Sequence, residues 1–185
     1  MTEVIADRPL RNFLSQADYW TWPSMTSEMA VVLSSRSLSR MLPIRVTAGD
    51  LAEEFVVPET AEDDVVGLIS RAQELIGLQS GWDSYGAQRV RREAALHALK
   101  VYSFFAREGL PAPALVPTVS GGVQLEWHVG AVDVEVEVRG QGDLHVFYED
   151  ESNGEAAEEL ILGARDYGRL ASLAERLINR SAALA

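Results

Sequence analysis

The sequence predicts an α+β fold in which helices pack on one face of an antiparallel β-meander of three to four strands. Two segments with apolar residues at helical spacing come first, a region of two-residue alternation follows them, and a third helical segment comes last. Short Gly-containing turns interrupt the alternating region, as hairpins require. This order is typical of helices gathered on one face of an antiparallel sheet.

The first fifty residues differ in composition from the rest of the chain. They are rich in Ser between Ser24 and Ser39, and their aromatic cluster of Tyr19, Trp20 and Trp22 follows no clear period. We therefore expect a partly irregular N-terminal arm over residues 1–50, with a short helix or strand, and a single α+β domain over residues 51–185. The arm either packs its rings on the core or docks a partner or a second copy.

Three later stretches carry the apolar stripe of an amphipathic helix. Thr60 is an N-cap residue type for the first, with Asp63 three residues on as a shorter capping-box partner. Residues 155–162, before the third stretch, are predicted to form a separate turn or a strand. The predicted helices run from Thr60 to Gly77, from about Val90 to Glu108 and from about Ala164 to Asn179.

Strict alternation predicts the strands of the meander over residues 123–129, 132–138 and 144–149, with 114–119 as a candidate fourth. A two-residue turn at 130–131 and a three-residue loop at 140–142 fix the register. A slip of one residue would turn the valines into water. The resulting pairs are Val129 with Val132, His128 with Asp133, Trp127 with Val134, Glu126 with Glu135, Gln124 with Glu137, Glu137 with His145 and Glu135 with Phe147.

In this register one face of the meander is apolar and the other is acidic. Glu126 directly opposite Glu135 is an unfavourable like-charge pair that folding does not need. The acidic face is either simply solvated or meets a basic partner or a cation. It carries Glu126, His128, Asp133, Glu135, Glu137 and His145.

Metal and cofactor chemistry find little support in the sequence. The chain has no Cys, which excludes disulfides, thiolate zinc sites and iron–sulfur clusters. His128 and His145 would lie roughly 13 Å apart on the sheet, too far to share one ion. No P-loop, G-x-S-x-G, H-E-x-x-H or G-x-G-x-x-G motif is present. We expect no metal and no cofactor, and assign no catalytic residue.

The net charge of −12 lies entirely in residues 51–185, because residues 1–50 hold five Arg and five acidic residues. This charge disfavours direct binding of nucleic acid and favours a basic partner or solubility. No stretch approaches about 18 consecutive apolar residues, and the first thirty residues contain no apolar run typical of a signal peptide. We therefore expect a cytoplasmic protein of prokaryotic character without membrane contact.

The stretch GWDSYGA, Gly81–Ala87, lies between the first two predicted helices. Asp83 can accept backbone N–H groups in an Asx turn. Trp82 and Tyr85 can bury ring area while their polar atoms find partners. The loop is either a structural staple that fixes the angle between the helices or a recognition loop.

Together with PTVSGGVQLEW, Pro117–Trp127, this loop resembles a family of uncharacterised bacterial proteins. Their pattern reads G-W-D-G-Y-G-A followed by P-T-x-x-G-G-x-x-L-E-W, and Ser84 replaces a Gly of that pattern. The resemblance covers about Leu75 to Asp150. It implies a small accessory protein, antitoxin-like or defence-associated, and supplies no catalytic residues. The matching positions are Gly81, Trp82, Asp83, Tyr85, Gly121, Gly122, Glu126 and Trp127.

These features favour a non-enzymatic prokaryotic protein-binding module, in the manner of an antitoxin, an immunity protein or an adaptor. The acidic face and the aromatic arm would bind a protein partner, which the charge suggests is basic. Two alternatives stay open: a small hydrolase using Glu126, Glu135 and His128, and a homo-oligomeric structural or phage-related component whose meander edge pairs with another copy.

Overall fold

The computed structural model describes residues 40–107, 110–140, 142–151, 155–163 and 167–184. The aromatic cluster predicted in the N-terminal arm, Tyr19, Trp20 and Trp22, lies outside these residues. The elements are β1 (Met41–Ala48), β2 (Leu51–Pro58), a 3-10 turn (Glu59–Ala61), α2 (Glu62–Gly77), α3 (Arg92–Phe105), β3 (Ala114–Pro117), β4 (Val123–Val129), β5 (Val132–Val138), β6 (Leu144–Asp150), β7 (Glu155–Leu162) and α4 (Tyr167–Leu184).

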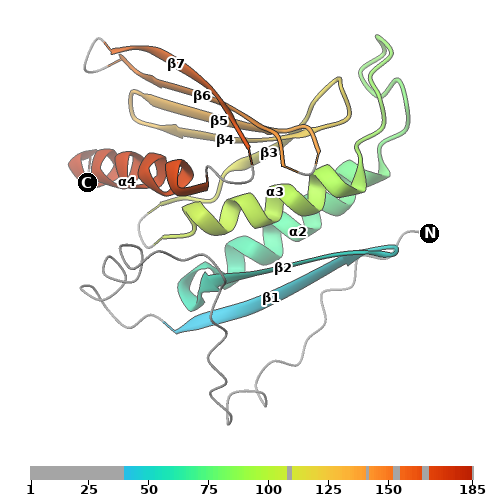
Figure 1. Cartoon of the computed structure of the whole chain (residues 1–185), viewed down its shortest axis with the longest axis horizontal. Helices are drawn as coiled ribbons and strands as arrows, with labels where there is room; N and C mark the ends of the chain where they lie inside the picture. Colours follow the sequence, from blue (N-terminus) through green and yellow to red (C-terminus); the bar gives the residue numbers. More distant parts are fainter. Residues whose placement is uncertain (1–39, 108–109, 141, 152–154, 164–166, 185) are drawn as a thin grey trace.

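The predicted α+β fold is confirmed, and the elements form three layers (Figure 1). A hairpin of β1 and β2 covers one side of α2 and α3, and an antiparallel sheet covers the other side. Helix α4 lies beside α3 under the same face of that sheet. In the described part of the chain this sheet has five strands in the order β3-β4-β5-β6-β7. Of the candidate strand at 114–119, residues 114–117 form β3, and residues 155–162 form β7.

The β1–β2 hairpin was not predicted from the sequence. Its first strand lies within residues 1–50, the range expected to form the arm, and Gly49–Asp50 is its two-residue turn. Gly49 adopts a φ of 69°, which glycine tolerates at no steric cost. Val46 and Phe55 are buried on the inner face of the hairpin against the helices.

The predicted cap of the first helix is wrong. Residues 59–61 form a 3-10 turn, and α2 begins at Glu62 with no side-chain hydrogen bond at its cap. Pro58, with φ fixed near −60°, starts this turn, so Thr60 lies inside it and not at the cap of α2. Three acidic residues in the first turn instead stabilise the start of α2, because their negative charges interact with the positive end of the helix dipole.

The other two helices differ from the prediction only at their ends. Helix α3 begins two residues later than predicted because Arg91 is extended and its N–H bonds to Gly121 O rather than within the helix. It ends at Phe105, where Ala106 leaves helical geometry. Helix α4 begins and ends later than predicted, at Tyr167 and Leu184.

The core lies between α3 and the inner face of the five-stranded sheet. The inward side chains of β4, β5 and β6 are all buried, so the apolar alternation read from the sequence matches the burial pattern. Trp127 stacks on Phe105 with ring centroids 4.3 Å apart, and its Nε1 donates to Pro111 O at 3.1 Å. Helix α3 is buried on nearly all sides because it is enclosed by both β layers.

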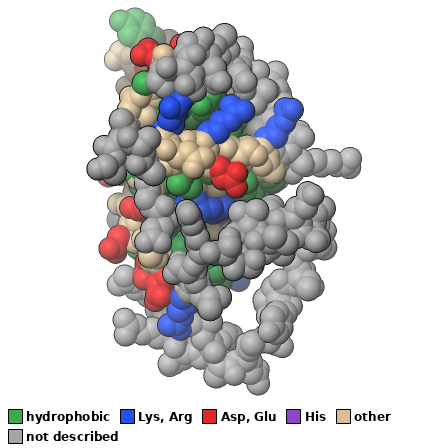
Figure 2. Space-filling model, turned by 90° about the vertical axis from the view of Figure 1, so that its left-hand side faces the viewer, with side chains coloured by type: hydrophobic (Ala, Val, Ile, Leu, Met, Phe, Trp, Pro, Cys, Tyr) green, Lys and Arg blue, Asp and Glu red, His purple; other side chains and the backbone are tan. Residues whose placement is uncertain are grey.

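Helix α4 is fastened to the sheet by basic side chains. Arg180 donates to the buried carboxylate of Asp150 on β6, and Arg176 lies over the ring of Tyr148 at 5.1 Å from its centroid. Figure 2 shows Lys and Arg side chains gathered in a row on this end of the molecule. These contacts tie the last helix to a strand about thirty residues before it.

Candidate functional site

The predicted register of the meander is confirmed at every pair. Glu126 lies opposite Glu135, His128 opposite Asp133, and Glu137 opposite both Gln124 and His145. No described helix covers the outer face of these strands (Figure 1). We call this surface the open sheet face; it comprises Gln124, Glu126, His128, Asp133, Glu135, Glu137, His145, Phe147 and Glu149.

A neutral amide bridges the like-charge pair at the centre of the open sheet face. Nε2 of Gln124 donates to Glu126 Oε1 at 3.2 Å and to Glu135 Oε2 at 2.7 Å. No Lys or Arg side chain of the described residues forms an ion pair with either carboxylate. The sheet tolerates the pair because both carboxylates share one amide donor, and both charges stay uncompensated by a permanent cation.

At one end of the face, His128 is held by a carboxylate. Its Nδ1 lies 2.6 Å from Asp133 Oδ1, and its Nε2 lies 3.9 Å from Glu126 Oε2. The hydrogen bond with Asp133 raises the pKa of His128 above its ordinary value, against the opposing effect of burial, and the charges of Asp133, Glu126 and Glu135 raise it further. This end of the face therefore becomes less negative when the pH falls.

Replacing Asp133 with Asn should lower the pKa of His128, because the hydrogen bond that contributes most to the shift loses its carboxylate. The pKa is measured from the NMR shifts of the His128 ring as the pH is varied. Asp63→Asn on α2 is the matched control and should leave that pKa unchanged. An unchanged titration in Asp133→Asn would show that the 2.6 Å contact does not govern this histidine.

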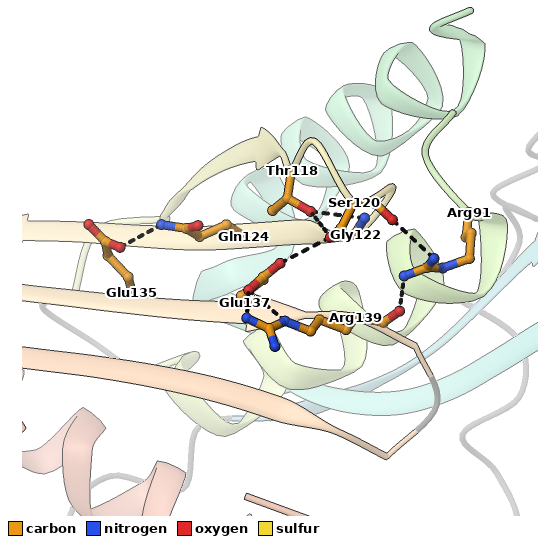
Figure 3. Close-up of polar contacts among 8 residues, drawn as sticks. All are labelled: Arg91, Thr118, Ser120, Gly122, Gln124, Glu135, Glu137 and Arg139. Atoms are coloured by element: carbon orange, nitrogen blue, oxygen red, sulfur yellow. Dashed lines mark hydrogen bonds and ion pairs between the residues drawn. The ribbon is translucent and has the colours of Figure 1, made fainter. Parts of the chain in front are cut away.

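At the other end of the face, the negative charge of Glu137 is compensated by Arg139 and by neighbouring hydroxyl groups (Figure 3). Its Oε2 accepts from Nε of Arg139 at 2.8 Å, and its Oε1 accepts from Ser120 Oγ at 3.4 Å. Burial alone would raise the pKa of Glu137, but the hydrogen bond and charge of Arg139, with the hydroxyls of Thr118 and Ser120, hold it below the ordinary value. On the open sheet face, the charge of Glu137 is thus balanced by an arginine, whereas the charges of Glu126 and Glu135 at the centre are not.

The GWDSYGA loop is closed by its own backbone and by Asp83. Asp83 Oδ1 accepts from the N–H groups of Tyr85 and Ala87, both at 2.9 Å, and these bonds lower the pKa of its carboxyl, that from Ala87 most. This confirms the predicted Asx turn. Trp82 Nε1 donates to Gln88 O at 3.2 Å, so its polar atom has the expected partner.

The prediction that Tyr85 buries its ring is wrong, because the residue is 95% exposed. Its backbone N–H points inward to Asp83, which leaves the ring on the outside of the turn. Ser84 adopts a φ of 67°, a backbone conformation that favours glycine. The loop is therefore a turn closed by hydrogen bonds, with the ring of Tyr85 exposed to solvent.

The two motif segments, distant in sequence, meet in space. Gln88 N donates to Val119 O at 3.0 Å, and Arg91 N donates to Gly121 O at 2.9 Å. Arg91 also donates from its guanidinium to the carbonyls of Ser120 and Arg139 (Figure 3). Both segments could be recognised in the sequence, but their contact was not predicted. The adjacent glycines Gly121 and Gly122 were the available signal, because glycine allows another backbone to approach closely.

Replacing Gly121 with Ala should lower the free energy of unfolding by about 2 kcal/mol. A Cβ at this position would lie 2.6 Å from the backbone oxygen of Arg89, and the residue has a φ of +78°. Gly140→Ala is the matched control, since nothing lies within 4 Å of its Cβ position, and it should change stability by less than about 0.5 kcal/mol. Urea unfolding followed by circular dichroism compares them, and equal midpoints would contradict the close approach.

A buried polar cluster lies on the opposite side of α3, and the sequence reading did not find it. Glu53, on the inner face of the hairpin, pairs with Lys100 at 3.0 Å and lies 3.7 Å from Nδ1 of His97. His97 Nε2 hydrogen-bonds Tyr167 OH at 2.8 Å, while its Nδ1 forms no hydrogen bond among the described residues. Burial lowers the pKa of His97, so the neutral ring joins the hairpin, α3 and α4.

Within the described ranges, no group of three or more His, Asp or Glu side chains is arranged to hold a metal ion. No described helix is long and apolar enough to cross a membrane. Comparison of the chain with models of known families, with curated proteins and with solved structures gave no match. Functional inference therefore depends on the geometry of the open sheet face and of the two joined motif loops.

Proposed function

We propose that the chain is a non-enzymatic protein-binding module whose open sheet face receives a basic protein partner. One observation carries the proposal: Glu126 and Glu135 are directly opposed and are bridged by the amide of Gln124 rather than by a cation. An arriving guanidinium could pair with both carboxylates without displacing a Lys or Arg side chain, and would donate charge-assisted hydrogen bonds to them. The opposed charges do not stabilise the sheet, and binding of a basic partner would explain why both are present.

Phe147 supports the same reading. It lies opposite Glu135 on the outer face, where the alternation would allow a polar residue, and it is half-buried. Aromatic residues surrounded by charged ones are typical of the centre of protein interfaces. The hydrolase alternative would need a carboxylate in a cleft that excludes water, whereas Glu126 and Glu135 lie on an outer face that no described helix covers (Figure 1).

The biological role we propose is that of a prokaryotic accessory protein, such as an antitoxin, an immunity protein or an adaptor. The resemblance of GWDSYGA and PTVSGGVQLEW to uncharacterised bacterial proteins supports this role, and the joint between the two segments gives that pattern a structural reason. The aromatic cluster of Tyr19, Trp20 and Trp22 would add a second contact for the partner. A cytoplasmic location follows from the same proposal.

A photo-crosslinking experiment tests the proposal. Phe147→p-benzoylphenylalanine places a crosslinker on the open sheet face, and the same residue at Val66, an exposed position on α2, is the control. We expect the full chain in its native host to give a protein adduct of defined mass from position 147 only. The adduct should decrease when Glu126 and Glu135 are both changed to Gln. Equal adducts from both positions, or an adduct unaffected by the Gln changes, would refute the proposal.

A further inference from the structure

The two joined motif loops form a second exposed surface, which we call the loop tip: residues 81–92 and 117–122. Tyr85, 95% exposed, and Val119, 65% exposed, are the most exposed large hydrophobic residues in the described part of the chain. Gln88 links their loops, because its N–H bonds to Val119 O and its carbonyl accepts from Trp82 Nε1. Both loops lie at the same end of the molecule (Figure 1).

The loop tip is basic, although the chain as a whole is acidic. It holds three Arg and one Asp, a net charge of +2, against −12 for the whole chain. The carboxylate of Asp83 is turned to backbone N–H groups, and Arg91 donates to carbonyls rather than to carboxylates. Arg89 is exposed and forms no ion pair among the described residues. The positive charge of Arg89 is therefore available to a partner.

The loop tip is also held in one shape before it binds. The Asx turn of Asp83, the indole bond of Trp82 and the close approach at Gly121 fix both loops through backbone contacts. An aromatic side chain on such a fixed backbone has only two torsion angles to lose on binding, which is why such rings act as interface anchors.

The surface that complements the loop tip is present on the chain itself. The open sheet face offers the uncompensated Glu126 and Glu135 beside the ring of Phe147. We propose that the loop tip of one copy docks on the open sheet face of a second copy, with Tyr85 against Phe147 and Arg89 against the two glutamates. This inference rests on the proposed function and identifies the basic surface that the open sheet face receives as the loop tip of a second copy, in a head-to-tail contact between unlike surfaces.

Physical considerations set the strength of this contact. A loop tip covers a small area, so the association is weak and requires a concentrated solution. Two copies of net charge −12 repel each other at long range, and salt screens that repulsion more than it screens a short, partly dehydrated Arg–Glu contact. Association should therefore be stronger at moderate than at very low ionic strength.

Sedimentation velocity of the full chain over a wide concentration range tests the inference. The tip variant is Tyr85→Ala with Arg89→Glu, and the face variant is Glu126→Gln with Glu135→Gln. Each variant alone should stay monomeric, because each lacks one of the two surfaces. Mixed together they should form a one-to-one complex, since the intact tip of one meets the intact face of the other. Arg45→Glu, on the outer face of the hairpin, is the matched charge control and should associate like the unchanged chain.

Each outcome decides the inference. Loss of association in both variants and its return on mixing supports it. An unchanged chain that stays monomeric at every concentration overturns it, as does association that persists in either variant or fails to return on mixing. A monomeric chain that still gives a defined foreign adduct from position 147 would leave the proposed function standing while removing the second copy as partner. Circular dichroism confirms that each variant is folded.

Discussion

Replacing Trp127 with Ala is expected to lower the free energy of unfolding by about 3–5 kcal/mol, because a large buried side chain leaves a cavity that cannot collapse. Trp127 is 2% exposed and stacks on Phe105 between the sheet and α3. Neighbouring β4 residues, Glu126 and His128, belong to the open sheet face. The variant should therefore weaken the support of that face as well as the core. Urea unfolding followed by circular dichroism measures the change.

Trp127→Phe separates packing from hydrogen bonding. A phenyl ring can keep most of the stack on Phe105 but loses the bond from Nε1 to Pro111 O. We expect this variant to lose only about 1–2 kcal/mol, the usual worth of one hydrogen bond and some ring volume. If Trp127→Ala and Trp127→Phe were equally destabilised, the carbonyl of Pro111 rather than the ring stack would dominate this site.

The meander could be predicted from the sequence because its constraints are local. Valines at every second position leave one possible inner face, and the Gly130–Ala131 turn fixes which residues pair. Once the register is known, the opposition of Glu126 and Glu135 follows without further information. The sequence therefore predicted both the sheet and the acidic residues on its open face.

The hairpin could not be predicted in the same way because its pattern is broken. Pro43 lies within β1, where proline usually argues against a strand, and Glu53 points inward among apolar residues of β2. Only the tertiary partner explains that glutamate, since Lys100 and His97 of α3 face it across the layer. A contact between elements more than forty residues apart does not change the spacing of apolar residues within either element, so it cannot be detected from that spacing.

The loop tip shows the same limit at the candidate site. Asp83 could be assigned to an Asx turn because its partners are two and four residues away. The contact of Gln88 with Val119 is non-local and was not predicted, and the exposure of Tyr85 follows from how the turn closes. Each segment was recognised by its residues, but their joint surface required the fold.

Replacing Arg180 with Met should lower the free energy of unfolding by about 3 kcal/mol, the lower end for breaking a buried ion pair. Nη2 and Nε of Arg180 lie 2.5 and 3.0 Å from Asp150 Oδ2, and the aspartate side chain is 1% exposed while that of the arginine is 33% exposed. The loss comes mainly from leaving the buried carboxylate without its guanidinium. Arg176→Met, on the same helix, is the control and should cost only about 0.5–1 kcal/mol, since it removes a contact with the Tyr148 ring.

A double-mutant cycle with Asp150→Asn shows what the pair contributes to the docking of α4. If the cost of Arg180→Met comes from a buried carboxylate that has lost its guanidinium, the double variant should recover a large part of it, because a neutral amide needs no guanidinium. Unfolding midpoints of the four proteins measure this coupling. Additive losses would mean instead that Arg180 stabilises α4 through its own packing on the sheet. Recovery would indicate that the pair itself, in addition to the apolar stripe of α4, contributes to the stability of the helix on the sheet.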